Sequence, residues 1–71
     1  SELSRTCGMA ELAIVYGNRY RSSYKEINDS LKIAEKEFKK GEYKKSLEIS
    51  LNALNIVEPG IHKKLMSACK E

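Results

Sequence analysis

The chain has few side chains that could perform covalent or acid–base chemistry. It contains one histidine, His62, and two cysteines, Cys7 and Cys69. His62 lies two residues after Gly60 and directly before two lysines, and no local spacing places a serine or a carboxylate next to it as a catalytic partner. The cysteines stand near opposite ends of the chain without a Cys-x-x-Cys pairing, so they indicate neither a zinc site nor a disulfide framework. We interpret His62 as a solvated surface residue and both cysteines as reduced, mostly packed thiols.

The acidic residues and glycines give no stronger indication of catalysis. The glutamates alternate with lysines along predicted helix faces, a pattern typical of solvated helices rather than of paired acid–base carboxylates. The sequence contains no Gly-rich phosphate loop and no cluster with metal-ligand spacing. It therefore predicts a protein that is not an enzyme, with no catalytic residue, no metal site and no cofactor.

The stretch with the clearest potential for recognition reads Tyr-Gly-Asn-Arg-Tyr-Arg-Ser over residues 16–22. Arginine and tyrosine are the residue types that most often anchor protein interfaces. An asparagine amide and planar arginine cations suit an acidic or carbonyl-rich partner surface. Residue types alone favour arginines that decorate a helix C-terminus and tyrosines that fill the core. The alternative is a partner-binding site formed by Asn18, Arg19, Tyr20 and Arg21.

Length and composition limit what can position these residues. The chain has 71 residues, 41% of them hydrophobic and 32% charged, so it is too apolar for a disordered tail. One proline, four glycines and few β-branched runs favour helix over sheet. A chain this short forms one small domain with a thin core, in which a deep catalytic cleft is not expected.

Charge and hydropathy exclude further classes. The formal net charge is +3, and the lysines are interspersed with glutamates, so the sequence disfavours nucleic-acid binding. No run approaches the roughly 18 apolar residues of a membrane span, and no signal-peptide pattern is present. The chain opens at Ser1 without a methionine, which indicates a piece of a longer protein.

Apolar residues recur at helical spacing along the whole chain. Ser23 followed by Glu26 has the form of a capping box that starts a new helix. Gly41 after two lysines is typical of a helix C-terminus, and Pro59 with the following glycine ends another helix. The fold predicted is an all-α, small three-helix bundle with an antiparallel hairpin and a short C-terminal helix. The predicted helices span residues 3–21, 24–40, 43–57 and 61–69, and their core includes Leu31 and Leu51.

The hairpin is similar to one tetratricopeptide repeat, because residues 38–59 combine a large residue, a glycine turn, a tyrosine, a small residue and a terminal proline. The upstream aromatic and Leu-Gly positions of that repeat are missing, and one extra residue precedes Pro59. A solenoid of this kind needs about three repeats for stability. A generic TPR-like peptide-binding adaptor is therefore the alternative function.

Two pieces of the chain together resemble the C-terminal end of EzrA, the family of septation ring formation regulators of low-GC Gram-positive bacteria. Family members tend to read Ile-Gln-Tyr-Ala-Asn-Arg-Tyr-Arg-Ser, and residues 14–22 read Ile-Val-Tyr-Gly-Asn-Arg-Tyr-Arg-Ser without a gap. Downstream, residues 55–60 read Asn-Ile-Val-Glu-Pro-Gly, which echoes the family ending Leu-Glu-Lys-Val-Glu-Pro-Gly. The resemblance covers residues 10–60, and the order and spacing of the two pieces make it specific.

This resemblance implies a non-enzymatic regulator of bacterial cell division that negatively modulates assembly of the FtsZ ring. It implies a long rod of spectrin-like helical repeats at the cytoplasmic face of the membrane, at the division septum, held by an N-terminal anchor that this chain lacks. The family patch associated with midcell localisation matches Asn18 and Arg19, whereas Val15 stands where glutamine is expected. With this resemblance we predict a partner-binding site formed by Asn18, Arg19, Tyr20 and Arg21. The implied partners are FtsZ and other division-ring proteins, and self-association through exposed apolar stripes is compatible with either function.

Overall fold

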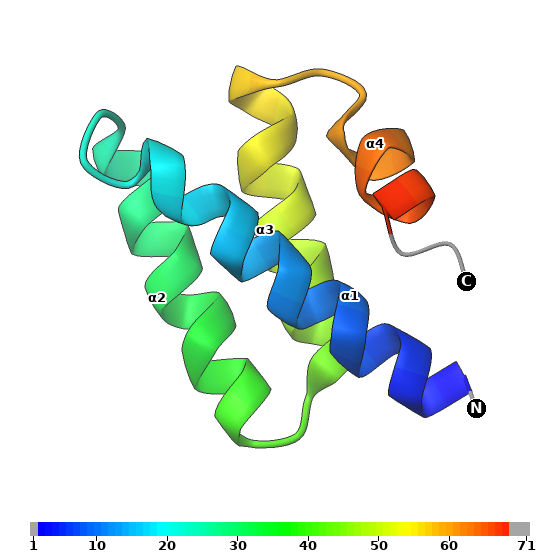
Figure 1. Ribbon diagram of the computed structural model, residues 1–71. Helices are drawn as coiled ribbons and strands as arrows, with labels where there is room; N and C mark the ends of the chain where they lie inside the picture. Colours follow the sequence, from blue (N-terminus) through cyan, green and yellow to red (C-terminus); the bar gives the residue numbers. More distant parts are fainter. Residues whose placement is uncertain (1, 69–71) are drawn as a thin grey trace.

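Helices make up most of the computed structural model, which describes residues 2–68 (Figure 1). The element order is α1 Glu2–Gly17, a 3-10 turn η1 Asn18–Tyr20, α2 Lys25–Lys39, α3 Tyr43–Val57 and α4 Ile61–Ala68. The predicted all-helical class is confirmed, and no strand occurs among residues 2–68. Cys7 is half-buried, and Cys69 lies outside the described residues.

The hairpin of α2 and α3 forms the centre of the molecule (Figure 1). Its turn ends at Gly41, whose φ of +87° lies in the left-handed region that glycine adopts without strain. The two helices approach closely because small residues lie between them. The hydroxyl of Ser46, fully buried, donates a hydrogen bond to the backbone oxygen of Ala34 at 2.7 Å.

The first helix lies across this hairpin and packs more extensively on α3 than on α2. One cluster of buried apolar side chains joins all four helices: Ala13, Ile27, Leu31, Ala53, Leu54, Ile61 and Leu65. Gly17 belongs to this contact, because a Cβ atom there would stand 2.7 Å from Leu31 Cδ1. The end of α1 is thus held tightly against α2 and α3, and α4 packs on the core through the buried Ile61 and Leu65.

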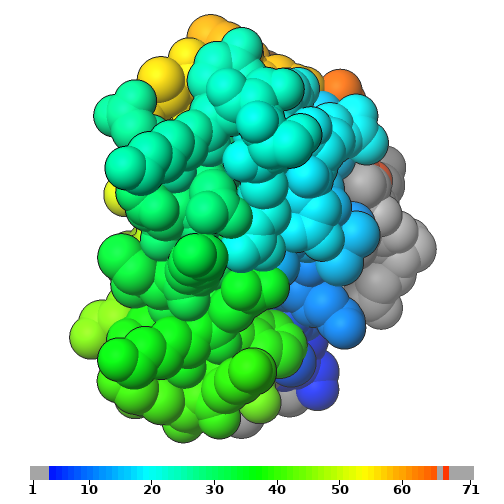
Figure 2. Space-filling model, turned by 90° about the vertical axis from the view of Figure 1, so that its left-hand side faces the viewer, coloured from blue at the N-terminus to red at the C-terminus, as the bar shows by residue number. Residues whose placement is uncertain are grey.

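The structure corrects two local predictions. The first α-helix ends at Gly17 instead of residue 21, because the chain tightens into η1 and the amides of Ser23 and Tyr24 both bond to the carbonyl oxygen of Tyr20. The capping box is also wrong: the N-cap of α2 is Tyr24, with φ −130° and no side-chain cap bond. The turn closed by these two bonds determines where α2 begins, and Ser23 is exposed in that turn. Figure 2 shows this turn and α2 covering one face of the molecule.

The two leucines predicted for the core differ in burial. Leu31 is fully buried as predicted, whereas Leu51 is half-buried and packs against the core cluster, in which Leu54 is the fully buried leucine of α3. The reason is that α1 and α4 approach α3 from the side on which Leu54 lies.

Candidate functional site

The four predicted site residues lie at the junction of α1, η1 and α2, and they divide into two pairs. Asn18 and Arg19 are exposed, whereas Tyr20 and Arg21 are half-buried. The 3-10 geometry of residues 18–20 causes this division, because successive side chains point in different directions around the tight turn.

Arg19 presents a cation that the fold leaves available. Its guanidinium carbon lies 4.1 Å from the centre of the Tyr16 ring, which is a cation–π distance. Among residues 2–68 the structure shows no hydrogen bond and no ion pair to Arg19. A guanidinium has five N–H donors in a fixed plane, so a stacked and otherwise unpartnered Arg19 is oriented to bind a carboxylate through two bonds.

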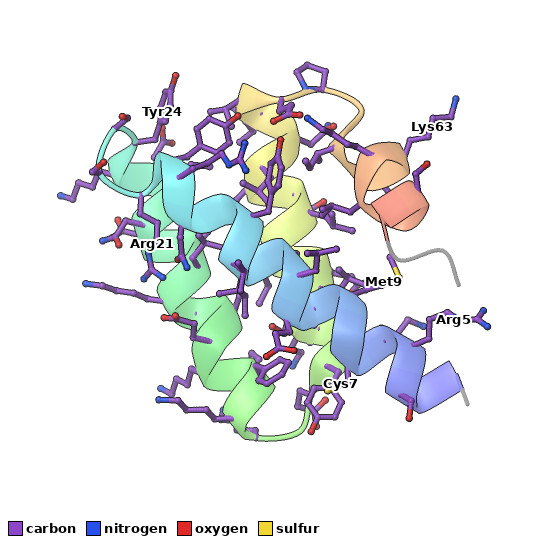
Figure 3. All side chains as sticks on the ribbon, viewed as in Figure 1. Arg5, Cys7, Met9, Arg21, Tyr24 and Lys63 are labelled. Carbon is purple, nitrogen blue, oxygen red and sulfur yellow. The ribbon has the colours of Figure 1, made fainter. Side chains whose placement is uncertain are left out.

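Arg21, in contrast, is engaged inside the molecule. Its Nε donates to Asn28 Oδ1 at 3.0 Å and its Nη1 to Asn18 Oδ1 at 3.2 Å. Its two terminal nitrogens donate to the Glu35 carboxylate at 3.2 and 3.4 Å. Figure 3 shows Arg21 lying over α2. Arg21 therefore connects η1 to α2 and holds the side-chain oxygen of Asn18. The side-chain nitrogen Nδ2 of Asn18 has no partner within the described part of the chain.

Two tyrosines of the stretch converge on Glu58, the C-cap residue of α3. The hydroxyls of Tyr16 and Tyr20 donate to Glu58 Oε1 at 2.5 and 2.8 Å. The ammonium of Lys64 in α4 donates to Glu58 Oε2 at 2.9 Å and to the Tyr16 hydroxyl oxygen at 3.1 Å. We call Tyr16, Tyr20, Glu58 and Lys64 the tyrosine–carboxylate cluster. It joins the two sequence pieces that carry the family resemblance.

Hydrogen bonding in this cluster shifts three pKa values. The bonds from Tyr16, Lys64 and Tyr20 lower the pKa of Glu58 from 4.5 to about 2, because they stabilise the carboxylate. The bond to Glu58 raises the pKa of Tyr20 above its ordinary value, and it also raises the pKa of Lys64. Sequence reasoning missed Glu58 and Lys64 as parts of the site, although Glu58 stands within the Glu-Pro-Gly ending that supports the resemblance.

These shifts predict how stability depends on pH. The pKa of Glu58 is lower in the folded state than the ordinary 4.5, so the carboxylate stabilises the fold fully above pH 4.5. That contribution is lost as the pH falls from 4.5 towards 2. Thermal melts followed by circular dichroism across this range should show a decline for the native chain that is smaller in Glu58→Gln. Equal declines in the two chains would contradict this role of Glu58.

An open groove between α1 and α2 adjoins the predicted site at residues 18–21. Its lining comprises Glu11, Ile14, Val15, Glu35, Phe38 and Lys39. Val15 is 58% exposed and contributes an apolar side chain where the family glutamine would place an amide. Glu35 belongs both to this groove and to the ion pair with Arg21, so the groove and the site share one wall.

The rest of the molecule adds no chemical centre among residues 2–68. His62 is exposed on α4, and no group of three or more His, Cys, Asp or Glu side chains is placed to hold a metal ion within that range. No helix in the described part of the chain is long and apolar enough to cross a membrane. The arrangement offers hydrogen-bond donors and cations to a partner.

Comparison with known proteins gives one consistent family. The family model described as septation ring formation regulator, EzrA, matches residues 1–69. Proteins of that name from Staphylococcus aureus strains JH9, Newman and NCTC 8325 are each 50% identical to this chain over 54 residues, which is 76% of the chain. The chain spans about 10% of the length of these curated relatives. No solved structure matches it.

Proposed function

Because this chain belongs to the EzrA family of septation ring formation regulators, we propose that it is a protein-binding part of a cell-division regulator and performs no chemistry of its own. The proposed partner-binding site is Asn18, Arg19, Tyr20 and Arg21, as predicted, with unequal roles. Asn18 and Arg19 contact the partner, while Tyr20 and Arg21 hold the turn that presents them.

The state of Arg19 is the observation that carries this proposal. Arg19 stacks on the Tyr16 ring at 4.1 Å, and its side-chain donors have no partner among residues 2–68. A pre-oriented side chain loses less conformational entropy when it binds. The partner surface that fits is acidic, because arginine binds carboxylates through paired, charge-assisted hydrogen bonds.

The resemblance supplies the candidate partner and place. We propose that the partner is FtsZ or another division-ring protein, and that binding serves negative regulation of ring assembly at the cytoplasmic face of the septal membrane. The helices would then form the end of a spectrin-like rod. Val15 makes the contact beside Asn18 apolar rather than polar, so a partner of this chain presents an apolar group at that point.

A TPR-like adaptor hairpin is the alternative function. It would bind peptide on a concave face lined by α2 and α3, but α1 already packs extensively on α3. Self-association stays a prediction, and its best candidate is Ile56, which is 76% exposed on α3.

The proposal predicts that the double variant Asn18→Ala, Arg19→Ala loses partner affinity and keeps its fold. Loss of one charge-assisted arginine contact costs roughly 1.5 to 3 kcal/mol, which corresponds to an increase in Kd of about 10- to 150-fold. The measurement is a calorimetric titration of purified FtsZ with each chain, with circular dichroism to verify helix content.

Lys25→Ala with Lys32→Ala provides the matched control, because both lysines are exposed on α2 and the control removes more positive charge than the double variant does. We expect the control to bind as the native chain does. Equal weakening by both variants would show that FtsZ senses net charge only. A double variant that unfolds would show that Asn18 and Arg19 are structural.

A further inference from the structure

We propose that Glu58 is a positioning residue for Arg19: its carboxylate fixes the tyrosine ring on which the guanidinium of Arg19 stacks. This inference rests on the proposed function only for its biological meaning, because the geometry it concerns is independent of any partner. The corner between α3 and α4, where Glu58 lies, then has a role in orienting Arg19, which lies in η1.

The first step is the fixation of Tyr16. Its hydroxyl donates to Glu58 Oε1 at 2.5 Å and accepts from Lys64 Nζ at 3.1 Å. The phenolic oxygen is therefore held from two sides by residues that lie 42 and 48 positions further along the chain. With its oxygen held, Tyr16 keeps one side-chain rotamer, so the position of the ring beside Arg19 is defined.

Tyr20 follows Arg19 in the chain and is bound to the same carboxylate as Tyr16. Tyr20 donates to the same oxygen of Glu58 at 2.8 Å, so residues on both sides of Asn18 and Arg19 are attached to one carboxylate oxygen. The rings of Tyr16 and Tyr20 lie 6.3 Å apart at an interplanar angle of 55°. The 3-10 turn between them is thereby clamped, and the backbone that carries Arg19 has little freedom.

Arg19 stacks on the Tyr16 ring that Glu58 holds in place. The Arg19 guanidinium carbon is 4.1 Å from the centre of the Tyr16 ring, and Lys64 Nζ is 5.4 Å from the same centre. Lys64 is already paired with Glu58, while Arg19 has no ion pair among residues 2–68. The carboxylate thus neutralises the cation that would compete for the ring, and it leaves Arg19 as the cation presented to a partner.

The position of Glu58 is itself well defined. It caps α3, and its backbone amide donates to the carbonyl oxygen of Leu54 at 2.8 Å. Gly60, with φ +88°, turns the chain immediately afterwards, and its amide donates to Asn55 Oδ1 at 3.3 Å. Three residues downstream of the cap the buried Ile61 starts α4, so packing anchors the corner from which Glu58 reaches the tyrosines.

The test is nuclear magnetic resonance of the Arg19 side-chain Nε–Hε group in the native chain and in Glu58→Gln. Stacking over a tyrosine ring shifts this proton upfield, and Tyr16→Leu supplies the value without a ring. We expect Glu58→Gln to move the signal most of the way towards the Tyr16→Leu value while helix content remains native. An unchanged Arg19 signal in a folded Glu58→Gln chain would overturn the proposal.

Two further variants keep this result interpretable. Glu48→Gln removes the same charge from an exposed position of α3 and should leave the Arg19 signal in place. Movement there would show that net charge, not Glu58, controls the stack, and would overturn the proposal. If Glu58→Gln does not fold, Glu58→Asp replaces it. That variant keeps the charge but shortens the side chain, and the same movement is expected.

A binding arm separates this proposal from the proposed function. Loss of pre-orientation of one long side chain weakens binding by about 2- to 12-fold, so Glu58→Gln should raise the Kd for purified FtsZ by that factor. If Arg19→Ala binds FtsZ like the native chain, the proposed function fails while the resonance result still decides the positioning role. If Arg19→Ala loses binding but the Arg19 signal is unmoved in Glu58→Gln, only the positioning role fails.

Discussion

Leu31→Ala should remove most or all of the stability of this chain. Leu31 is fully buried at the centre of the contact between α1, α2 and α3, where its methyl groups meet Gly17. Truncation of such a leucine costs about 2 to 5 kcal/mol, since it loses apolar burial and leaves a cavity. Small domains have total stabilities of about 5 to 15 kcal/mol, and a 71-residue chain lies at the lower end.

The measurement is urea unfolding followed by circular dichroism at 222 nm. Ile33→Ala is the matched control, because Ile33 lies on the same helix and is 52% exposed. We expect the control to lower the unfolding midpoint only slightly and Leu31→Ala to abolish or strongly shift the transition. A Leu31→Ala transition equal to that of Ile33→Ala would contradict the placement of the core.

Ser46→Leu should be the second most damaging change. Ser46 is fully buried between α2 and α3, and its hydroxyl donates to the Ala34 carbonyl oxygen at 2.7 Å. A leucine there would force the two helices apart at a cost of about 1 to 3 kcal/mol, and it would leave the carbonyl without this extra bond. The same urea experiment measures the effect.

Lys45→Leu controls for the added leucine, because it places the same side chain on the exposed neighbour of Ser46. We expect Lys45→Leu to keep a native-like transition midpoint. A Ser46→Leu chain as stable as Lys45→Leu would show that the space between α2 and α3 is wider than the structure indicates.

The positions of the helices were predictable because they depend on local signals. Period-3.6 apolar spacing located all four, and Gly41 together with Pro59 marked two ends correctly. The early end of α1 was not predictable from local signals. Residues 18–21 do not forbid a helix, and the chain leaves the α-helix there because Tyr16 and Tyr20 bond to Glu58 at the corner between α3 and α4, and Arg21 to α2.

The candidate site shows the same limit. Residue types and the family resemblance indicated residues 18–21, but they did not predict that Arg21 is bonded inside the molecule and that Arg19 is exposed. That difference depends on Asn28 and Glu35, which lie 7 and 14 residues from Arg21 and meet it only in the folded chain. Ser46 was missing from the predicted core for a related reason. Serine is a polar residue, and it can be buried here because its hydroxyl bonds to a buried carbonyl oxygen.

Side-by-side titration of purified FtsZ with Arg19→Ala and Arg21→Ala distinguishes an arginine that contacts the partner from one that holds the turn. We expect Arg19→Ala to keep native stability and to lose most of its affinity. We expect Arg21→Ala to be less stable, because its bonds to α2 are lost, and to bind more tightly than Arg19→Ala at temperatures where it is folded. Native affinity in Arg19→Ala would contradict the role of Arg19 as the partner contact.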